Sequence, residues 1–289
     1  MADTDLLFLA LFIFLPIFLL MFLKLIVRPR PVKIPIKSRH VFVTGGSRGI
    51  GLALACQVAT EGARVTILAR NLDQLEEAKT SIRLSTGIDV AIVSVDVCDF
   101  VAVKEAVESA GPIDVLICNQ GVYASCELEN QDIKEIKGTI DVNLIGSFNL
   151  VKAALPGMKN RSDRKPVSIA FMSSQAGQVG IYGYAAYSAK IKRRPPLTRI
   201  IATSSGAMQV EEVVKKALNG IKSGSFFVPC NFEGFMLSIG TAGPAPQTSY
   251  LMAFIEVISV GVIRIVGLCF QWTWYGSIEK WHAQQKLLD

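Results

Sequence analysis

A glycine-rich segment, TGGSRGIG at residues 44–51, has the residue types and spacing needed to bind a phosphate. It follows a short β-branched run, 40–44, and leads directly into a helical period. Glycines allow a tight turn and a close approach of the backbone, so the free N–H groups of the helix N-terminus can bind a pyrophosphate. The segment therefore predicts a dinucleotide site. Its predicted contacts are Gly45, Ser47, Arg48, Gly49, Ile50 and Gly51.

Residues at the ends of the next predicted strands indicate which dinucleotide binds. Folds that bind NAD commonly place an Asp or Glu after the second strand, whereas this strand, 63–69, is followed by Arg70. Arg70 and Arg48 could clamp a 2′-phosphate, because a guanidinium is forked and permanently charged. The pattern favours NADPH over NADH. Asp96 ends the third strand and is placed to bond the adenine, and Asn119 ends the fourth, where the cofactor would cross.

The elements that must position these residues are short β-branched runs that alternate with helical periods. Near-continuous apolar strands separated by helices predict a parallel sheet covered by helices on both faces. The predicted fold class is therefore α/β, a doubly wound parallel sheet. The expected strands are 40–44, 63–69, 89–97, 114–119 and 167–174, and the expected helices are 50–61, 72–84, 100–110 and 133–155.

A second group of polar and glycine motifs lies at the ends of these strands and on the helices between them. Its members are Asn119 and Gly121 in an NxG pattern, Asn143 in VNLIG, the pair Ser173 and Ser174, and Tyr187, 13 residues after Ser174. Together with TGGSRGIG, they resemble the short-chain dehydrogenase/reductase family over about residues 38–190. The resemblance implies a Rossmann domain in which NADPH delivers a hydride to a carbonyl carbon.

The same resemblance implies a role for each residue of the reaction centre. Tyr187 passes a proton to the carbonyl oxygen, and a neighbouring lysine makes its phenolate accessible, because a free tyrosine has a pKa of about 10. Ser174 hydrogen-bonds the carbonyl; Ser173 is the other candidate, because consecutive strand residues point to opposite faces. Asn143 holds a water that positions the lysine. Tyr187 and Lys190 also contact the cofactor.

This sequence departs from the family pattern at the lysine. The family places the lysine four residues after the tyrosine, where this chain has Ile191. Lys190 and Lys192 flank that position, and each is rotated by about 100° around a helix from the expected direction. Lys190 is the catalytic candidate that remains, and we expect impaired turnover.

A segment that the family has after the tyrosine also lacks a counterpart here. Pro195 and Pro196 stop a helix within two turns. Roughly forty residues, including a strand and a loop that closes over the substrate, are absent before an expected helix at 210–219 and an expected strand at 225–230 resume the pattern. The Rossmann domain, 39–232, is therefore expected to be incomplete after residue 190.

Both ends of the chain are apolar. Residues 6–23 carry no charge, and the apolar stretch reaches 22 residues, about 33 Å of helix. The chain starts with acidic residues and shows no cleavage site, which indicates a retained transmembrane anchor, 1–27. The basic linker that follows, 28–38, can contact anionic lipid. Because basic residues favour the cytosolic side of a membrane, we expect the rest of the protein in the cytosol. Residues 233–289 are apolar and end in aromatics, which favours membrane-associated helices over helices packed against the sheet or a partner.

Within the family, SSQAGQVGIYGYAAYSA and the two apolar ends are most similar to plant-like reductases of the endoplasmic reticulum membrane. These act on 3-ketodihydrosphingosine, a long-chain keto-sphingoid base, and give dihydrosphingosine. Two alternatives stay open: a membrane reductase of steroid or fatty-acyl ketones, and an inactive nucleotide-binding subunit. A homo-oligomer is compatible with each of them.

Composition excludes several other classes of protein. A hydrophobic share of 51% with 19% charged residues excludes a disordered chain, and the modest net charge of +6 argues against a nucleic-acid partner. The six cysteines have no CxxC spacing, and His40 and His282 are far apart. We therefore expect neither a metal site nor a disulfide framework.

Overall fold

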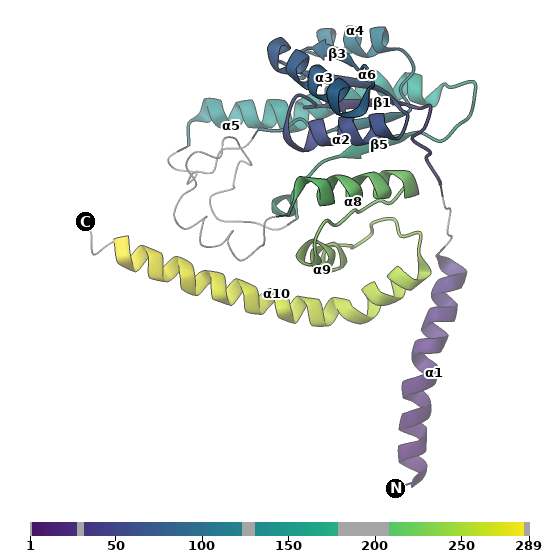
Figure 1. The fold of residues 1–289 in the computed structure, drawn as a ribbon. Coiled ribbons are helices and arrows are strands. Elements are labelled where there is room, and N and C mark those ends of the chain that lie inside the picture. The colour runs from purple at the N-terminus through teal and green to yellow at the C-terminus, as the bar shows by residue number, and fades with distance from the viewer. Residues whose placement is uncertain (1, 28–31, 123–130, 179–207, 286–289) are drawn as a thin grey trace. The chain divides into compact units, whose positions relative to one another are not determined.

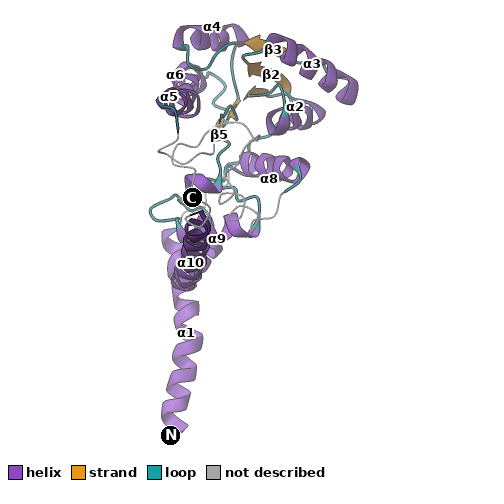
Figure 2. Ribbon diagram, turned by 90° about the vertical axis from the view of Figure 1, so that its left-hand side faces the viewer, coloured by secondary structure: helices purple, strands orange, loops and turns teal. Residues whose placement is uncertain are grey.

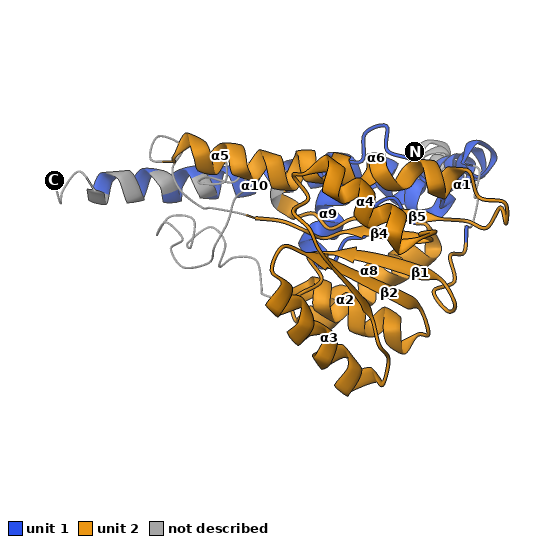
Figure 3. Ribbon diagram, turned by 90° about the horizontal axis from the view of Figure 1, so that it is seen from above, with its two compact units in different colours: residues 1–32, 225–289 blue, residues 33–224 orange. Residues whose placement is uncertain are grey.

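The computed structural model describes residues 2–27, 32–122, 131–178 and 208–285 (Figure 1). Its chain divides into two compact units, Met1–Val32 with Ser225–Asp289 and Lys33–Gly224 (Figure 3). The second unit carries every motif of the predicted nucleotide site.

A parallel sheet, drawn in orange in Figure 2, forms the centre of the second unit. Its strand order is β3-β2-β1-β4-β5. Its strands are β1 (His40–Thr44), β2 (Arg64–Ala69), β3 (Ala91–Ser94), β4 (Val115–Cys118) and β5 (Ser168–Phe171). The order reverses beside β1, so the carboxyl ends of β1 and β4 flank the point where such sheets bind ligands. The predicted doubly wound parallel sheet is confirmed.

Helices cover both faces of this sheet, as the continuous burial of β1 and β4 requires. Val41 and Val43 of β1 pack toward α2 (Gly49–Thr60), α3 (Leu72–Thr86) and α8 (Val210–Ser223). Phe42, between them, packs toward α4 (Phe100–Ala110) and α6 (Gly146–Lys159). Ile34 and Ile36, which the sequence places in the juxtamembrane linker, are buried in the first of these clusters.

The amino ends of the strands are joined by buried polar contacts. Asp114 accepts a hydrogen bond of 2.6 Å from Arg39 and one of 2.7 Å from the backbone N–H of His40. The His40 ring contacts the hydroxyl of Thr66 at 2.8 Å, and burial lowers the pKa of His40 below its usual value. These contacts hold β1, β2 and β4 in register at the end opposite the predicted site.

The predicted helix 133–155 is confirmed as a nearly continuous helical segment with an unusual centre. It consists of α5 (Ile133–Ile140), one π-helical turn, η2 (Asp141–Ile145), and then α6. The wider turn lies at Asn143, and such turns often occur at functional sites.

The predicted strand at 225–230 is wrong: the structure has a loop there. Phe226 and Phe227 are 62% and 41% exposed, and Pro229 has no N–H to donate to a neighbouring strand. β-Propensity forms a strand only where a neighbouring strand is available for pairing.

The described part of the first unit consists of helices joined by loops. These are α1 (Ala2–Ile26), α9 (Phe232–Gly240) and α10 (Tyr250–Gln285), and α10 packs on both α1 and α9. In the described part of the chain, the stretch Tyr250–Ser277 of α10 is long and apolar enough to cross a membrane, with a mean hydropathy of 2.2.

Candidate cofactor site and reaction centre

The glycine-rich loop is shaped by close backbone approach. Gly45 has a φ of +61°, which favours glycine, and a Cβ at Gly51 would lie 2.1 Å from the Gly45 carbonyl oxygen. α2 begins at Gly49, and its N-cap residue, Arg48, makes no side-chain cap. The first N–H groups of α2 are therefore free of a side-chain cap, which suits the binding of a phosphate.

Asn119, at the end of β4, holds this loop in place. Its side-chain Nδ2 donates to the carbonyl oxygens of Thr44 and Gly45, at 3.2 Å each. Its backbone N–H donates to the Thr44 hydroxyl at 3.0 Å. Asn119 therefore acts on the loop itself, at the place where the sequence analysis expects the cofactor to cross.

Asn143 is fixed by the segment that follows β4. Its Oδ1 accepts from the backbone N–H of Val122, and its Nδ2 donates to the Val122 carbonyl oxygen, both at 2.8 Å. This paired amide contact locks the orientation of the Asn143 side chain across the start of the β4–α5 connection.

A cavity of about 540 Å³ lies beside these residues. Its lining comes from α2, the end of β4, the η2–α6 segment and the end of β5. These residues are Ile50, Cys118, Asn119, Gln120, Gly121, Val122, Asn143, Leu144, Ser147, Phe148, Val151, Phe171, Met172 and Ser173. The structure thus brings together five of the predicted site residues: Ile50, Asn119, Gly121, Asn143 and Ser173.

The structure describes only part of the predicted reaction centre. Ser173 lines the cavity, and Ser174 is the next, half-buried residue of the chain. Tyr187 and Lys190 lie outside the described residues. Burial raises the pKa of the Cys118 thiol, in the cavity wall, to about 12, so this group stays protonated at neutral pH.

The predicted adenine side lies after β2 and β3. A guanidinium nitrogen of Arg70 is 3.7 Å from a carboxylate oxygen of Asp96, and both side chains are about half exposed. The second oxygen of Asp96 accepts from the backbone N–H of Cys98 at 3.0 Å. Because an exposed ion pair at this distance is weak, Arg70 is available to an anion.

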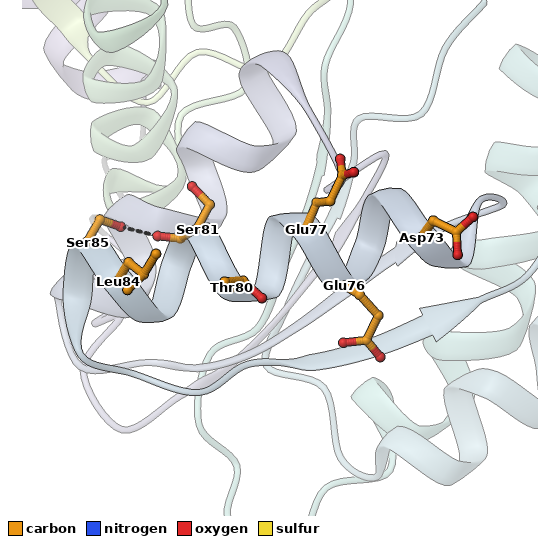
Figure 4. A pocket seen from close by; sticks show the side chains of 7 residues that line it. All are labelled: Asp73, Glu76, Glu77, Thr80, Ser81, Leu84 and Ser85. Carbon is orange, nitrogen blue, oxygen red and sulfur yellow. Dashed lines mark hydrogen bonds between the residues drawn. The ribbon is translucent and has the colours of Figure 1, made fainter.

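A shallow depression on α3 was not expected from the sequence. Unlike the cavity, it is not formed where several elements meet. All seven of its lining residues come from that one helix (Figure 4). Asp73, Glu76 and Glu77 give it a negative charge, and Ser85 donates to the Ser81 carbonyl oxygen at 2.9 Å within the helix. It is an exposed helix face on the far side of α3 from the sheet.

Comparison with known proteins identifies the architecture. The sequence model of a family described as short chain dehydrogenase matches residues 39–191. The chain belongs to the short-chain dehydrogenase family. The family and the oxidoreductase class predicted from the motifs are thereby confirmed.

Three similar proteins of this family have informative names. The 3-dehydrosphinganine reductase TSC10A of Arabidopsis thaliana is 54% identical, over 89% of this chain and 90% of that protein. TSC10B of the same plant, also a 3-dehydrosphinganine reductase, is 50% identical, over 96% of each chain. A short chain dehydrogenase from Escherichia coli CFT073, solved in complex with NADPH, has a TM-score of 0.50 and 27% identity, covering 54% of this chain and 67% of that one.

The alignment with TSC10B also contains a gap on the side of this short-chain dehydrogenase. It spans 318 positions, which is 29 more than the 289 residues of this chain, so at least 29 positions of that relative have no counterpart here. The family match ends at residue 191. The absence of a segment after Tyr187 stays a prediction.

Sequence reasoning did not single out the side chains of Gln120 and Ser147, which line the cavity. Gln120 belongs to the CNQG motif, next to Asn119, but its side-chain partners Thr44 and Ser147 are 76 and 27 residues away in the chain. No local pattern indicates contacts of that separation.

Proposed function

We propose that this protein is an NADPH-dependent reductase that converts 3-ketodihydrosphingosine, also called 3-dehydrosphinganine, to dihydrosphingosine in sphingolipid synthesis. The observation that carries this proposal is the 54% identity to a 3-dehydrosphinganine reductase over 90% of that relative's length. The cavity also supports the proposal, because its lining runs from Ile50, at the start of the helix that follows the glycine-rich loop, to Ser173 of the predicted carbonyl site.

The residues of the loop fit a dinucleotide. A side chain at Gly51 would fill the space next to the Gly45 carbonyl, whereas a Cβ at Gly49 would meet no atom within 4 Å and faces open space at the helix start. By the strand order, the adenine half belongs over β2 and β3, near Arg70 and Asp96, and the nicotinamide half over β4 and β5. Arg70, with Arg48, would bind the 2′-phosphate of NADPH.

When bound, NADPH supplies the hydride to the carbonyl carbon. Tyr187 gives the proton to the carbonyl oxygen, and Ser174 donates a hydrogen bond to the same oxygen. Ser173, whose side chain lines the cavity, is the alternative donor. Asn143 contributes through its position, since its side chain is held by Val122 on both of its polar atoms.

The lysine register limits this reaction in the present chain. Lys190 lies three residues after Tyr187, and Ile191 takes the position one helical turn away. A cation displaced around the helix does not lower the pKa of Tyr187 as a correctly placed one would. We therefore expect cofactor binding to be retained and turnover to be low.

The membrane is the proposed location of the protein, specifically that of the endoplasmic reticulum with the Rossmann unit facing the cytosol. Two features support this: the apolar N-terminal segment followed by basic residues, and the apolar stretch Tyr250–Ser277 of α10. A membrane location suits a substrate with a long alkyl chain, which partitions into lipid.

The test is a binding and turnover assay on the full-length protein in detergent micelles. NADPH binding is followed by fluorescence, and dihydrosphingosine is measured by mass spectrometry after incubation with 3-ketodihydrosphingosine. A steroid ketone and a fatty-acyl ketone serve as comparison substrates. Binding of NADPH with slow, selective formation of dihydrosphingosine supports the proposal; absence of NADPH binding, or preference for another ketone, contradicts it.

A further inference from the structure

Gln120 connects the end of β1 with the η2–α6 wall of the cavity. Its Oε1 accepts a hydrogen bond from the hydroxyl of Thr44, the last residue of β1. Its Nε2 donates to the hydroxyl of Ser147, at the start of α6, at 2.8 Å. The Ser147 hydroxyl in turn donates to the backbone carbonyl oxygen of Asn143 at 2.8 Å. One side chain thus links the strand that opens the glycine-rich loop to the π-helical turn that carries Asn143.

The neighbours of Gln120 make similar contacts, so residues 119–122 together form a strap between the glycine-rich loop and the Asn143 turn. Residue 119 bonds the glycine-rich loop, residue 120 bonds Thr44 and Ser147, and residue 122 bonds the Asn143 amide. The strap also packs tightly, because a Cβ at Gly45 would lie only 3.0 Å from the Gln120 Cα. Gln120 is therefore held at its backbone as well as at both ends of its carboxamide.

We propose that Gln120 is a positioning residue that sets the distance between the phosphate-binding loop and the Asn143 turn, and so aligns the nicotinamide half of the cofactor. This inference rests on the proposed function, since it assumes that a dinucleotide crosses from the glycine-rich loop into the cavity. Gln120 itself need not touch the reacting atoms; it acts through Thr44, Ser147 and Asn143.

The chemistry of the carboxamide explains why glutamine fits this position. The hydrogen-bonded relay Thr44–Gln120–Ser147 needs an acceptor toward Thr44 and a donor toward Ser147, and a primary amide offers both. Glutamate keeps the acceptor but cannot donate to Ser147, and alanine reaches neither hydroxyl. Without the central amide, Thr44 keeps its contacts with the backbone of Ile117 and Asn119, and Ser147 keeps its bond to the Asn143 carbonyl, but the side-chain link between the two hydroxyls is lost.

The experiment compares the full-length wild type with Gln120→Ala for two probes, NADPH and 2′,5′-ADP. The second probe has the adenine and phosphate groups but lacks the nicotinamide half. We expect the dissociation constant for NADPH to rise at least fivefold and that for 2′,5′-ADP to stay within twofold. A residue that only stabilises the fold would change both by the same factor or neither.

Further variants make the test specific. Gln120→Glu should fall between wild type and Gln120→Ala for NADPH, because one of the two bonds survives. Ser147→Ala breaks the same link from the other side and should give a similar selective loss, so it replaces Gln120→Ala if that variant does not fold. Gln57→Ala, at an exposed position of α2, is the matched control and should leave both dissociation constants unchanged.

Hydrogen–deuterium exchange provides a readout that needs no ligand. Peptides covering residues 141–148 should exchange faster in Gln120→Ala, whereas peptides covering α3 should not change. If wild type fails to bind NADPH, the proposed function is wrong. If wild type binds NADPH but Gln120→Ala weakens both probes equally, or leaves NADPH binding within twofold, the positioning role is overturned.

Discussion

Gly51→Ala tests whether the glycine-rich loop has the geometry described above. The added Cβ would lie 2.1 Å from the Gly45 carbonyl oxygen and 2.5 Å from the Asn119 Nδ2. Non-bonded heavy atoms settle at about 3.5 Å, so the start of α2 and the loop must separate by roughly 1 Å. That shift also breaks the two hydrogen bonds that Asn119 donates to Thr44 and Gly45.

The cost follows from these contacts. Overpacking costs about 1–3 kcal/mol, and each of the two lost hydrogen bonds about 1 kcal/mol, so we expect a loss of roughly 3–5 kcal/mol in the free energy of unfolding. NADPH affinity should fall at least tenfold, because a charge-assisted hydrogen bond to a displaced phosphate is worth about 1.5–3 kcal/mol.

The assay is a fluorescence titration with NADPH, run beside a urea unfolding curve. Gly87→Ala is the control, because Gly87 has a φ of +74° with no atom within 4 Å of an added Cβ, and it ends α3 away from the site. It should lower stability by about 1–2 kcal/mol and leave NADPH binding unchanged. A Gly51→Ala protein that binds NADPH within threefold of wild type would refute this account of the loop.

Three further predictions concern the cofactor, the membrane and pH. Arg70→Glu should weaken NADPH at least tenfold more than NADH in a binding titration, since it removes a phosphate partner and adds repulsion; equal losses would argue against the clamp. Deletion of residues 1–27 should leave the protein membrane-associated and resistant to extraction by carbonate, because α10 also carries a long apolar stretch; release by carbonate would show that α10 does not insert. Because the pKa of His40 is lowered by burial, the folded state binds fewer protons than the unfolded one, so stability is full above about pH 6.5 and falls as the pH drops toward the folded pKa. The thermal midpoint should fall between pH 7.5 and 5.5, and His40→Gln should flatten that slope.

Local signals in the sequence were sufficient for elements whose ends are determined by their own residues. The predicted helix 100–110 matches α4, because Asp99 accepts from the N–H groups of Val101 and Ala102 and Gly111, with a φ of 76°, ends the helix. The strand 40–44 matches β1, which is buried along its whole length. The glycine-rich loop was predictable for the same reason, since its constraints are local.

Features that depend on distant partners were not predictable in this way. Residues 225–230 have high β-propensity but form a loop, because a strand needs a pairing partner, which the local sequence does not reveal. β3 is shorter than expected, Ala91–Ser94 in place of 89–97, because it pairs with β2 only over that span. The Gln120 relay depends on contacts formed only after the sheet is assembled, so its residues read as ordinary loop and helix positions.

The central claim is that this chain is a 3-ketodihydrosphingosine reductase whose turnover is limited by the segment after Tyr187. The most direct measurement compares the rate of dihydrosphingosine formation from NADPH and 3-ketodihydrosphingosine for two full-length proteins: this chain, and a version in which the corresponding complete segment of TSC10A follows Tyr187. We expect the grafted protein to be faster by orders of magnitude, with equal NADPH affinity. An unmodified chain within tenfold of the grafted protein would contradict the importance of the lysine register and the missing segment, and a grafted protein that binds NADPH yet forms no dihydrosphingosine would contradict the proposed reaction.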